Sequence, residues 1–292
     1  MNSSKAIISN PRVRKLGHYI RFMDFYLLKN LEAFGLIPKA FHENHAVRRY
    51  KRTMHSWAPG YLEYRNSVCE DIFTSDIPEK PFGATLDERV VELPWALKNL
   101  SAGDKVLDAG SALNHEFVLR RMEDMDVTIA TLYPEPYRRA KGESYVYDDL
   151  RSLSFKDSVF DRIACISTIE HVGFDCSIYM HDSGLKAKDI VSGGREKVIS
   201  ELCRVLKPGG KLLVSGPCGR PYDGETFRNL GLADVDALVS AFEPTDFRLK
   251  FYLSTDKGWV QVDRENTALA KATYRGNGAA AAGAVFLLEL TK

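Results

Sequence analysis

The chain has 292 residues, of which 45% are hydrophobic, enough for one large domain with an extension or for two modest domains. Its formal net charge of +1 excludes a strong overall attraction to nucleic acid or to an anionic membrane. Residues 1–60, however, hold eleven Lys or Arg and three Asp or Glu, so this segment carries +8 and the remainder about −7. We interpret the basic segment as a solvated helix face packed on an acidic domain, with a phosphate- or lipid-binding patch as the alternative.

The five cysteines are widely spaced and none forms a Cys-x-x-Cys pair, so the sequence predicts neither a disulfide framework nor a zinc cluster. The N-terminus, Met-Asn-Ser-Ser-Lys, lacks the apolar core of a signal peptide. No apolar run approaches the roughly 18 residues that cross a bilayer. We therefore expect a soluble, cytoplasmic protein without a membrane span.

The first predicted element is an amphipathic helix over residues 18–37, where apolar side chains recur at three- and four-residue steps. Residues 78–81, Pro-Glu-Lys-Pro, are typical of a linker. A second helix is predicted over residues 85–100. We accordingly divide the chain into a helical, basic N-terminal extension over residues 1–84 and a second domain over residues 85–292.

In the second domain, short apolar runs rich in β-formers alternate with helical patterns. The predicted strands cover residues 105–109, 127–132, 144–147, 160–167, 211–215, 247–253 and 284–290, and the predicted helices cover 116–125, 195–206 and 233–242. This alternation indicates crossover connections and an α/β fold, with a seven-stranded, mainly parallel sheet covered by helices on both faces. Because no long helix separates the last two strands, we expect them to form an antiparallel hairpin at one edge.

Ligands of open α/β sheets bind beyond the carboxyl ends of the strands, so the residues that follow each strand are the candidates for a site. The first strand ends in Val-Leu-Asp-Ala-Gly at residues 106–110, where a glycine permits a tight turn and a close ligand approach. Residues 148–161 follow the third strand, residues 167–172 follow the fourth, and Leu-Lys-Pro-Gly-Gly-Lys-Leu occupies 206–212. Each piece alone is common, but their order and spacing together are specific.

With these pieces, the sequence resembles the class I S-adenosylmethionine-dependent methyltransferases, and in particular the small-molecule methyltransferases. The matching motifs are VLDAG, D-L-x-x-L-x-F-x-D-x-x-F-D, I-E-H-V and R-V-L-K-P-G-G-K-L. They cover roughly residues 104–219, and the strand order extends the resemblance to residue 292. The resemblance implies a Rossmann-like fold and S-adenosylmethionine as the cofactor.

The resemblance also implies which residues hold the cofactor. By this resemblance, the amino-acid end of the cofactor would be bound by Asp108, Ala109, Gly110 and Ser111. Asp149 and Leu150 would contact the adenine, and Ser167 and Thr168 would line the pocket near the transferable methyl group. Asp149 would accept a hydrogen bond from the adenine amino group, with Asp148 as the alternative acid. Asp161 matches a position that is mostly structural in the family.

The sequence departs from the family pattern at two places. No further glycine follows Gly110, since residues 111–114 are Ser-Ala-Leu-Asn, so this loop is less permissive than usual. The second strand lacks the terminal acid that normally holds both ribose hydroxyls. Glu135 is the candidate to reach back to the ribose, or else it is an exposed surface acid. These departures bear on cofactor affinity more than on cofactor identity.

Methyl transfer from a sulfonium is a direct displacement that needs alignment and often a base for the acceptor proton. Histidine is the usual base, and His171 and His181 are the candidates, with an architectural role for His171 as the alternative. His181 lies in an insertion over residues 173–194, which either arches over the acceptor pocket with Asp175, Tyr179 and Lys186 or is a plain surface loop. Asp175 and Asp182 could hold a divalent metal near the acceptor, but nothing in their spacing demands it, so we assign no metal site.

The N-terminal extension is expected to complete the acceptor pocket. Its His55, Trp57, Tyr61 and Tyr64 offer aromatic surfaces with polar tips that suit a sugar or an aromatic ring, with core packing as the alternative. We expect O-methylation of a small molecule or a glycan unit. The alternatives are methylation of RNA or protein, and an inactive relative that binds the cofactor. We find no RNA-binding module and do not expect a nucleic-acid partner, whereas a homo-oligomer is left open.

Overall fold

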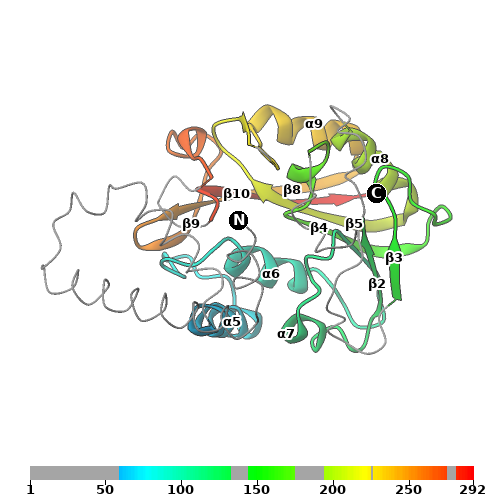
Figure 1. Ribbon diagram of the computed structural model, residues 1–292, viewed down its shortest axis with the longest axis horizontal. Coiled ribbons are helices and arrows are strands. Elements are labelled where there is room, and N and C mark those ends of the chain that lie inside the picture. The colour runs from blue at the N-terminus through cyan, green and yellow to red at the C-terminus, as the bar shows by residue number, and fades with distance from the viewer. Residues whose placement is uncertain (1–58, 133–143, 175–193, 225, 275–280) are drawn as a thin grey trace, which may run out of the picture. The chain divides into compact units, whose positions relative to one another are not determined.

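The computed structural model describes residues 59–132, 144–174, 194–224, 226–274 and 281–292 (Figure 1). The chain divides into two compact units, of which the first comprises residues 1–64 and 278–280 and the second comprises residues 65–277 and 281–292. The first unit lies almost entirely outside the described residues, and so do the predicted helix over residues 18–37 and the basic clusters. The second unit contains the sheet.

The second unit is built on one eight-stranded sheet with the order β3-β2-β1-β4-β5-β10-β8-β9. The pairs among β3, β2, β1, β4 and β5 are parallel, and β10 is antiparallel to both of its neighbours. The α/β class and the mainly parallel Rossmann-like sheet are therefore confirmed. The strands are β1 Lys105–Ala109, β2 Asp126–Thr131, β3 Ser144–Tyr147, β4 Phe160–Ile166, β5 Leu206–Pro217, β8 Asp246–Thr255, β9 Gly258–Val262 and β10 Ala284–Thr291.

The predicted number of seven strands was wrong, because the short strand β9 adds an eighth. β9 pairs with β8 across a tight turn, and this antiparallel pair is the edge hairpin. The last strand, β10, was expected in that hairpin but lies inside the sheet, between β5 and β8. A central place suits its composition, because seven of its eight residues are buried.

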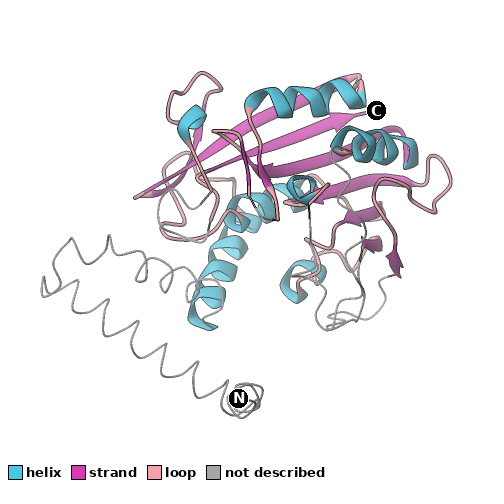
Figure 2. Cartoon of the chain, turned by 45° about the horizontal axis from the view of Figure 1, so that its top comes forward, coloured by secondary structure: helices cyan, strands magenta, loops and turns pink. Residues whose placement is uncertain are grey.

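The helices lie on both faces of the sheet (Figures 1 and 2). In Figure 1, α8 and α9 lie above the sheet, whereas α6 and α7 lie below it. The helix predicted over residues 116–125 is shorter than expected, because after Leu119 the backbone makes i→i+3 turns such as Met122 N–H to Leu119 O at 2.9 Å. The helix bounds are α5 Pro59–Thr74, α6 Arg89–Lys98, α7 Glu116–Leu119, α8 Arg195–Val205 and α9 Leu232–Phe242.

The Pro-Gly-Gly segment, predicted as a turn before a strand, lies inside β5 as an irregularity of that strand. Phe160 of β4 pairs with Leu206, but the next partner of β4, Arg162, pairs with Lys211, so residues 207–210 bulge out of the ladder. Gly209 has a φ of +74°, which an L side chain rarely adopts.

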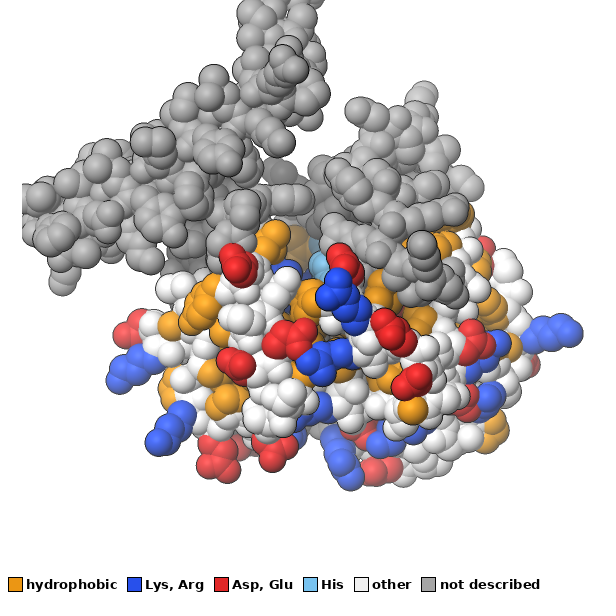
Figure 3. All heavy atoms as spheres, turned by 90° about the horizontal axis from the view of Figure 1, so that it is seen from below, with side chains coloured by type: hydrophobic (Ala, Val, Ile, Leu, Met, Phe, Trp, Pro, Cys, Tyr) orange, Lys and Arg blue, Asp and Glu red, His pale blue; other side chains and the backbone are white. Residues whose placement is uncertain are grey.

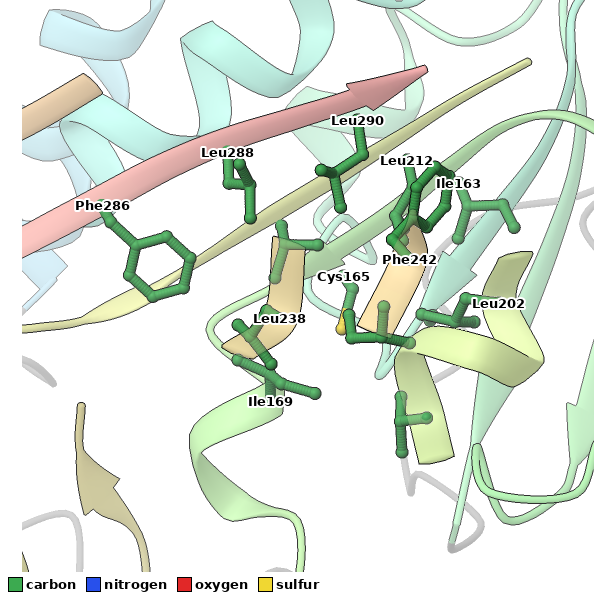
Figure 4. Packing of buried hydrophobic residues seen from close by; sticks show 14 of the residues in the cluster. Ile163, Cys165, Ile169, Leu202, Leu212, Leu238, Phe242, Phe286, Leu288 and Leu290 are labelled. Carbon is green, nitrogen blue, oxygen red and sulfur yellow. The ribbon is translucent and has the colours of Figure 1, made fainter. Parts of the chain in front are cut away.

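The main core lies between the sheet and the two upper helices (Figure 4). Alternate residues of β10, Phe286, Leu288 and Leu290, point toward α9, where Leu238 and Phe242 meet them. This period-two alternation follows from strand geometry and leaves the intervening residues of β10 to pack on the other face. Among the described residues, no helix is long and apolar enough to cross a membrane.

Candidate functional site

The two ends of the expected cofactor site lie on the same edge of the sheet. Gly110 directly follows β1 and Asp149 follows β3, and β2 pairs in parallel with both strands. Because neighbouring strands are about 4.8 Å apart, positions two strands apart are separated by about 10 Å across the sheet. The Tyr145 hydroxyl of β3 also donates to Asn114 Oδ1 at 3.1 Å, which ties the third strand to the loop after the first.

The loop after β1 is shaped by its own aspartate. Asp108 is completely buried, and its two carboxylate oxygens accept the backbone N–H groups of Ala112 at 3.1 Å and Leu113 at 2.9 Å. The loop between them carries two consecutive positive φ angles, +111° at Gly110 and +65° at Ser111. Asp108 therefore holds the loop in place by accepting two of its backbone N–H groups, as a capping side chain does at the start of a helix. Ala109 ends β1 and is buried.

Gly110 is in tight contact with the residue that follows β4 by two positions. A Cβ atom placed on Gly110 would lie 2.2 Å from Thr168 Oγ1 and 2.4 Å from Thr168 Cγ2, so only glycine fits. Two of the predicted cofactor positions, from different strands, are thus in direct contact. Beside them, the Ser111 hydroxyl is buried and lacks a hydrogen-bond partner among the described residues. An orphaned buried hydroxyl is a group that a bound polar ligand would satisfy.

Asp149 at the end of β3 is held in place by Arg151. Arg151 Nη2 donates to Asp149 Oδ2 at 2.7 Å and Arg151 Nε donates to Oδ1 at 3.0 Å, so the pair is bidentate. The Arg151 guanidinium lowers the pKa of Asp149, which keeps this half-exposed carboxyl group ionised and able to accept hydrogen bonds. Leu150 is partly buried against the core, and Asp148 accepts the Ser154 N–H at 2.8 Å.

The turn after β4 is fixed by a buried side chain from α6. Ser167 has a φ of +41° and donates its hydroxyl to Glu92 Oε1 at 2.8 Å. Ser215, at the end of β5, donates to the same oxygen at 2.8 Å. Thr168 donates its hydroxyl to the Ile166 carbonyl at 2.9 Å. The Ser167 hydroxyl is therefore engaged with α6, whereas Thr168 faces Gly110.

Glu92 is one of several buried acids that the sequence analysis did not single out. Glu92 is 0% exposed and also pairs with Arg89 Nη1 at 2.8 Å. Burial, together with the neighbouring Asp87 and Glu92 carboxylates, raises the pKa of Glu88 to about 7. Burial likewise raises the pKa of Glu170, whose Oε2 has no hydrogen-bond partner among the described atoms. The sequence feature that could have pointed to Glu92 is its spacing from Arg89, because an Arg-x-x-Glu pair within an apolar helix indicates a paired and buried carboxylate.

His171 has a geometry that suits a base. It lies in the short 3₁₀ helix η1, Ile169–His171, and its Nδ1 is 2.7 Å from the Thr226 carbonyl oxygen. A carbonyl only accepts, so Nδ1 carries the proton and Nε2 has the lone pair. Burial lowers the pKa of His171, so the ring is neutral near neutral pH. Nε2 is 4.0 Å from Glu170 Oε1, and the ring lies beside Phe227 at a centroid distance of 6.2 Å.

Several predicted residues lie outside the described part of the chain. These are Glu135, His181, Asp175, Asp182, Tyr179, Lys186, His55 and Trp57. Among the described residues, no group of three His, Cys, Asp or Glu side chains is placed to hold a metal ion. Asp161 pairs with Lys207 at 2.8 Å and accepts the Lys105 N–H at 3.0 Å, which is a structural role at the start of two strands. On the face drawn in Figure 3, basic and acidic side chains are interspersed, without a large area of one sign on the described atoms.

Residues 107–214 match the family described as "Methyltransferase domain". A curated protein of Encephalitozoon cuniculi with the printed name "Putative methyltransferase ECU09_1500" is 31% identical over 109 residues, which are 37% of this chain and 43% of that protein. The chain thus matches less than half of that relative's length.

The solved structures that resemble the chain include two proteins of low sequence identity. The YcgJ protein of Bacillus subtilis is 16% identical, with a TM-score of 0.45 over 69% of this chain and 98% of that one. The 1,6-didemethyltoxoflavin-N1-methyltransferase of Burkholderia thailandensis, solved with S-adenosylhomocysteine, is 15% identical, with a TM-score of 0.42 over 79% of this chain and 85% of that one.

The strand order and the family match agree with each other. The second unit has a mainly parallel, Rossmann-like sheet, and residues 107–214 within it are similar to the methyltransferase domain family. The residues present fit S-adenosylmethionine, the cofactor implied by the sequence motifs, in three respects. Gly110 leaves no Cβ in the loop, the Ser111 hydroxyl lacks a partner among the described residues, and Asp149 is an ionised acceptor two strands away.

Proposed function

We propose that this protein transfers a methyl group from S-adenosylmethionine to an oxygen of a small molecule or a glycan unit. The observation that carries the proposal is the convergence of Gly110, Ser111 and Asp149 on one edge of the parallel sheet, about 10 Å apart by strand spacing. A distance of this order suits a ligand with an amino-acid end and an adenine end. The family match supports the same reading.

We further propose how the chain's residues hold the cofactor. The backbone N–H and the hydroxyl of Ser111 would bind its carboxylate, because a positive-φ loop presents donors to anions, while the N–H groups of Ala112 and Leu113 stay bonded to Asp108. Asp149 would accept the adenine amino group, and Leu150 would flank the ring. Thr168, in contact with Gly110, would line the methyl-bearing part of the pocket. Glu135 is the proposed ribose acid.

When bound, the cofactor supplies an electrophilic methyl carbon on a positively charged sulfur. The protein's part is to align the acceptor, to exclude water and to remove the acceptor proton. His171 suits the last task, since its lowered pKa keeps the ring neutral and the Thr226 carbonyl holds the proton on Nδ1. Nε2 would then take the acceptor proton. His181 and the N-terminal extension over residues 1–84 are proposed to complete the acceptor pocket.

The experiment that tests cofactor binding is titration calorimetry with S-adenosylmethionine and S-adenosylhomocysteine. We expect Asp149→Ala to weaken binding by about 1–3 kcal/mol, because it leaves a polar ligand group without its acceptor. The matched control is Asp236→Ala, which removes a bidentate Asp–Arg pair with Arg264 on the surface. The control should leave the dissociation constant unchanged. Equal effects of the two variants, or no binding by the wild type, would contradict the proposed site.

The class of acceptor is tested by transfer of a labelled methyl group. Separate pools of hydroxylated small molecules, glycans, RNA and protein are incubated with the protein and the labelled cofactor. Label in a small molecule or glycan, located on an oxygen atom by NMR of the purified product, supports O-methylation. Label in RNA or protein alone would replace the proposal with one of the macromolecular alternatives. Cofactor binding without transfer to any pool would indicate a relative that has lost turnover.

A further inference from the structure

Glu92 is a buried carboxylate on α6 that lies outside the motifs matched in the sequence. From its contacts we infer that Glu92 is a positioning residue, which holds the turn after β4 against the cofactor loop. The inference rests on the proposed function, because it concerns the same pocket. It adds a residue from a helix that precedes the sheet.

Glu92 binds three groups that belong to three different elements. Its Oε1 accepts the hydroxyls of Ser167 and Ser215, both at 2.8 Å, and its Oε2 accepts Arg89 Nη1 at 2.8 Å. The side chain is 0% exposed. A buried carboxylate with three charge-assisted hydrogen bonds is strongly constrained in position. It therefore fixes the ends of β4 and β5 relative to α6.

The turn that Glu92 holds is strained and needs such support. Ser167 has a φ of +41°, which is costly for a residue with a side chain. Its N–H donates to the Ser215 carbonyl at 3.0 Å, and its hydroxyl donates to Glu92. Without the second bond, the backbone could relax toward an ordinary conformation. That relaxation would move the next residue, Thr168.

Movement of Thr168 would reach the cofactor loop directly. Thr168 fills the space where a side chain of Gly110 would be, with its Oγ1 2.2 Å from the ideal Cβ position. Gly110 is anchored on its other side by an N–H bond to the Ala130 carbonyl at 2.8 Å. The contacts therefore run from Glu92 through Ser167 and Thr168 to the loop that is proposed to bind the amino-acid end of the cofactor.

The competing explanation is that Glu92 only attaches α6 to the sheet. The two serines distinguish these explanations, because both donate to the same oxygen at the same distance. Only Ser167 is adjacent to Thr168. Ser167→Ala and Ser215→Ala therefore remove equivalent bonds, but only the first should disturb the cofactor loop.

The test measures the dissociation constant of S-adenosylhomocysteine by calorimetry and the melting temperature, on the full chain. We expect Ser167→Ala to raise the dissociation constant about tenfold, while Ser215→Ala leaves it within about twofold, with similar melting temperatures for both. Glu92→Ala should match Ser167→Ala, and Glu92→Gln should recover most of the affinity because the amide retains an oxygen acceptor. Glu289→Gln, which alters a buried pair with Lys211 away from this turn, is the control for loss of a buried charge.

Two results would overturn the inference, and they are distinguishable. If the wild type binds but the two serine variants have equal dissociation constants, Glu92 is a structural residue only, and the proposed function stands. If the wild type binds neither form of the cofactor, the proposed function fails and the inference fails with it. Should Glu92→Ala fail to fold, the comparison of the serine variants still decides the question.

Discussion

Replacing Glu88 by glutamine should remove a pH-dependent loss of stability. Glu88 is 7% exposed, and its Oε2 accepts the Ala282 N–H at 2.9 Å. Burial and the nearby Asp87 and Glu92 carboxylates raise its pKa from 4.5 to about 7, although Arg89 partly opposes this shift. The native state therefore retains a proton on Glu88 over a pH range in which the unfolded chain has lost it.

The sign and size of the effect follow from proton linkage. Below pH 4.5 the group is protonated in both states, and its contribution to stability is fully present. As the pH rises from 4.5 to about 7, the native state binds more protons than the unfolded state, so the free energy of unfolding falls. At about 1.4 kcal/mol for each pH unit, the loss is on the order of 3 kcal/mol. Glutamine does not ionise, and its amide oxygen can still accept the N–H bond.

The assay is urea unfolding of the wild type and Glu88→Gln at intervals between pH 4.5 and pH 8. Between pH 4.5 and pH 8, we expect the free energy of unfolding of the variant minus that of the wild type to rise by on the order of 3 kcal/mol. Any effect of His171, whose pKa is lowered, acts in the opposite direction but is common to both proteins. Asp236→Asn, in an exposed pair with Arg264, is the control whose difference should stay flat. A pH-independent difference for Glu88→Gln would show that native Glu88 does not hold a proton that the unfolded chain has lost.

Three further substitutions test other parts of the structure. Gly110→Ala should abolish cofactor binding in calorimetry and lower the free energy of unfolding in urea by about 1–3 kcal/mol. Adding Thr168→Ala should restore part of this stability, because it removes the Thr168 Oγ1 atom that lies 2.2 Å from the new Cβ. His171→Gln should lower the rate of methyl transfer about 100-fold with an unchanged dissociation constant for the cofactor, and the wild-type rate should hold to below pH 6.5 because the pKa of His171 is lowered. Trp259→Phe should cost about 1–2 kcal/mol in urea unfolding, because the Nε1–H bond to the buried Leu86 carbonyl, 3.1 Å long, is lost; no change would contradict a role for that bond.

Much of the fold follows from local patterns in the sequence. β1 and β3 begin and end where the apolar runs predict, since strand ends are set by neighbouring turn formers. β9 was missed because it begins with a glycine, which is unfavourable in strands, and a glutamine interrupts its short apolar run. The place of β10 between β5 and β8 depends on contacts between residues far apart in the chain. The apolar pattern of β10 shows that it is buried but does not specify which strands it pairs with.

The candidate site was predictable where it depends on motifs. Gly110 and Asp149 were singled out because they follow strands of a parallel sheet and match motifs of the methyltransferase resemblance. The structure places both at one edge of the sheet, and their role in cofactor binding stays a prediction. Glu92 was missed for a physical reason. In a helix, a charged residue normally faces water, and burial depends on how the helix is rotated against the sheet. Only the three-dimensional contacts with Ser167 and Ser215 show that this glutamate faces inward.

The central place of β10 also constrains the order in which the sheet can assemble. A chain emerges from the ribosome N-terminus first, so β8 and β9 are complete before β10 exists. Until residues 284–291 appear, the open side of β5 is an apolar strand edge with unpaired backbone groups, and the hairpin has nothing to join. The edge of β5 therefore stays exposed until the last strand is made. We expect a chain truncated before Ala284 to keep this edge unpaired and to aggregate through it.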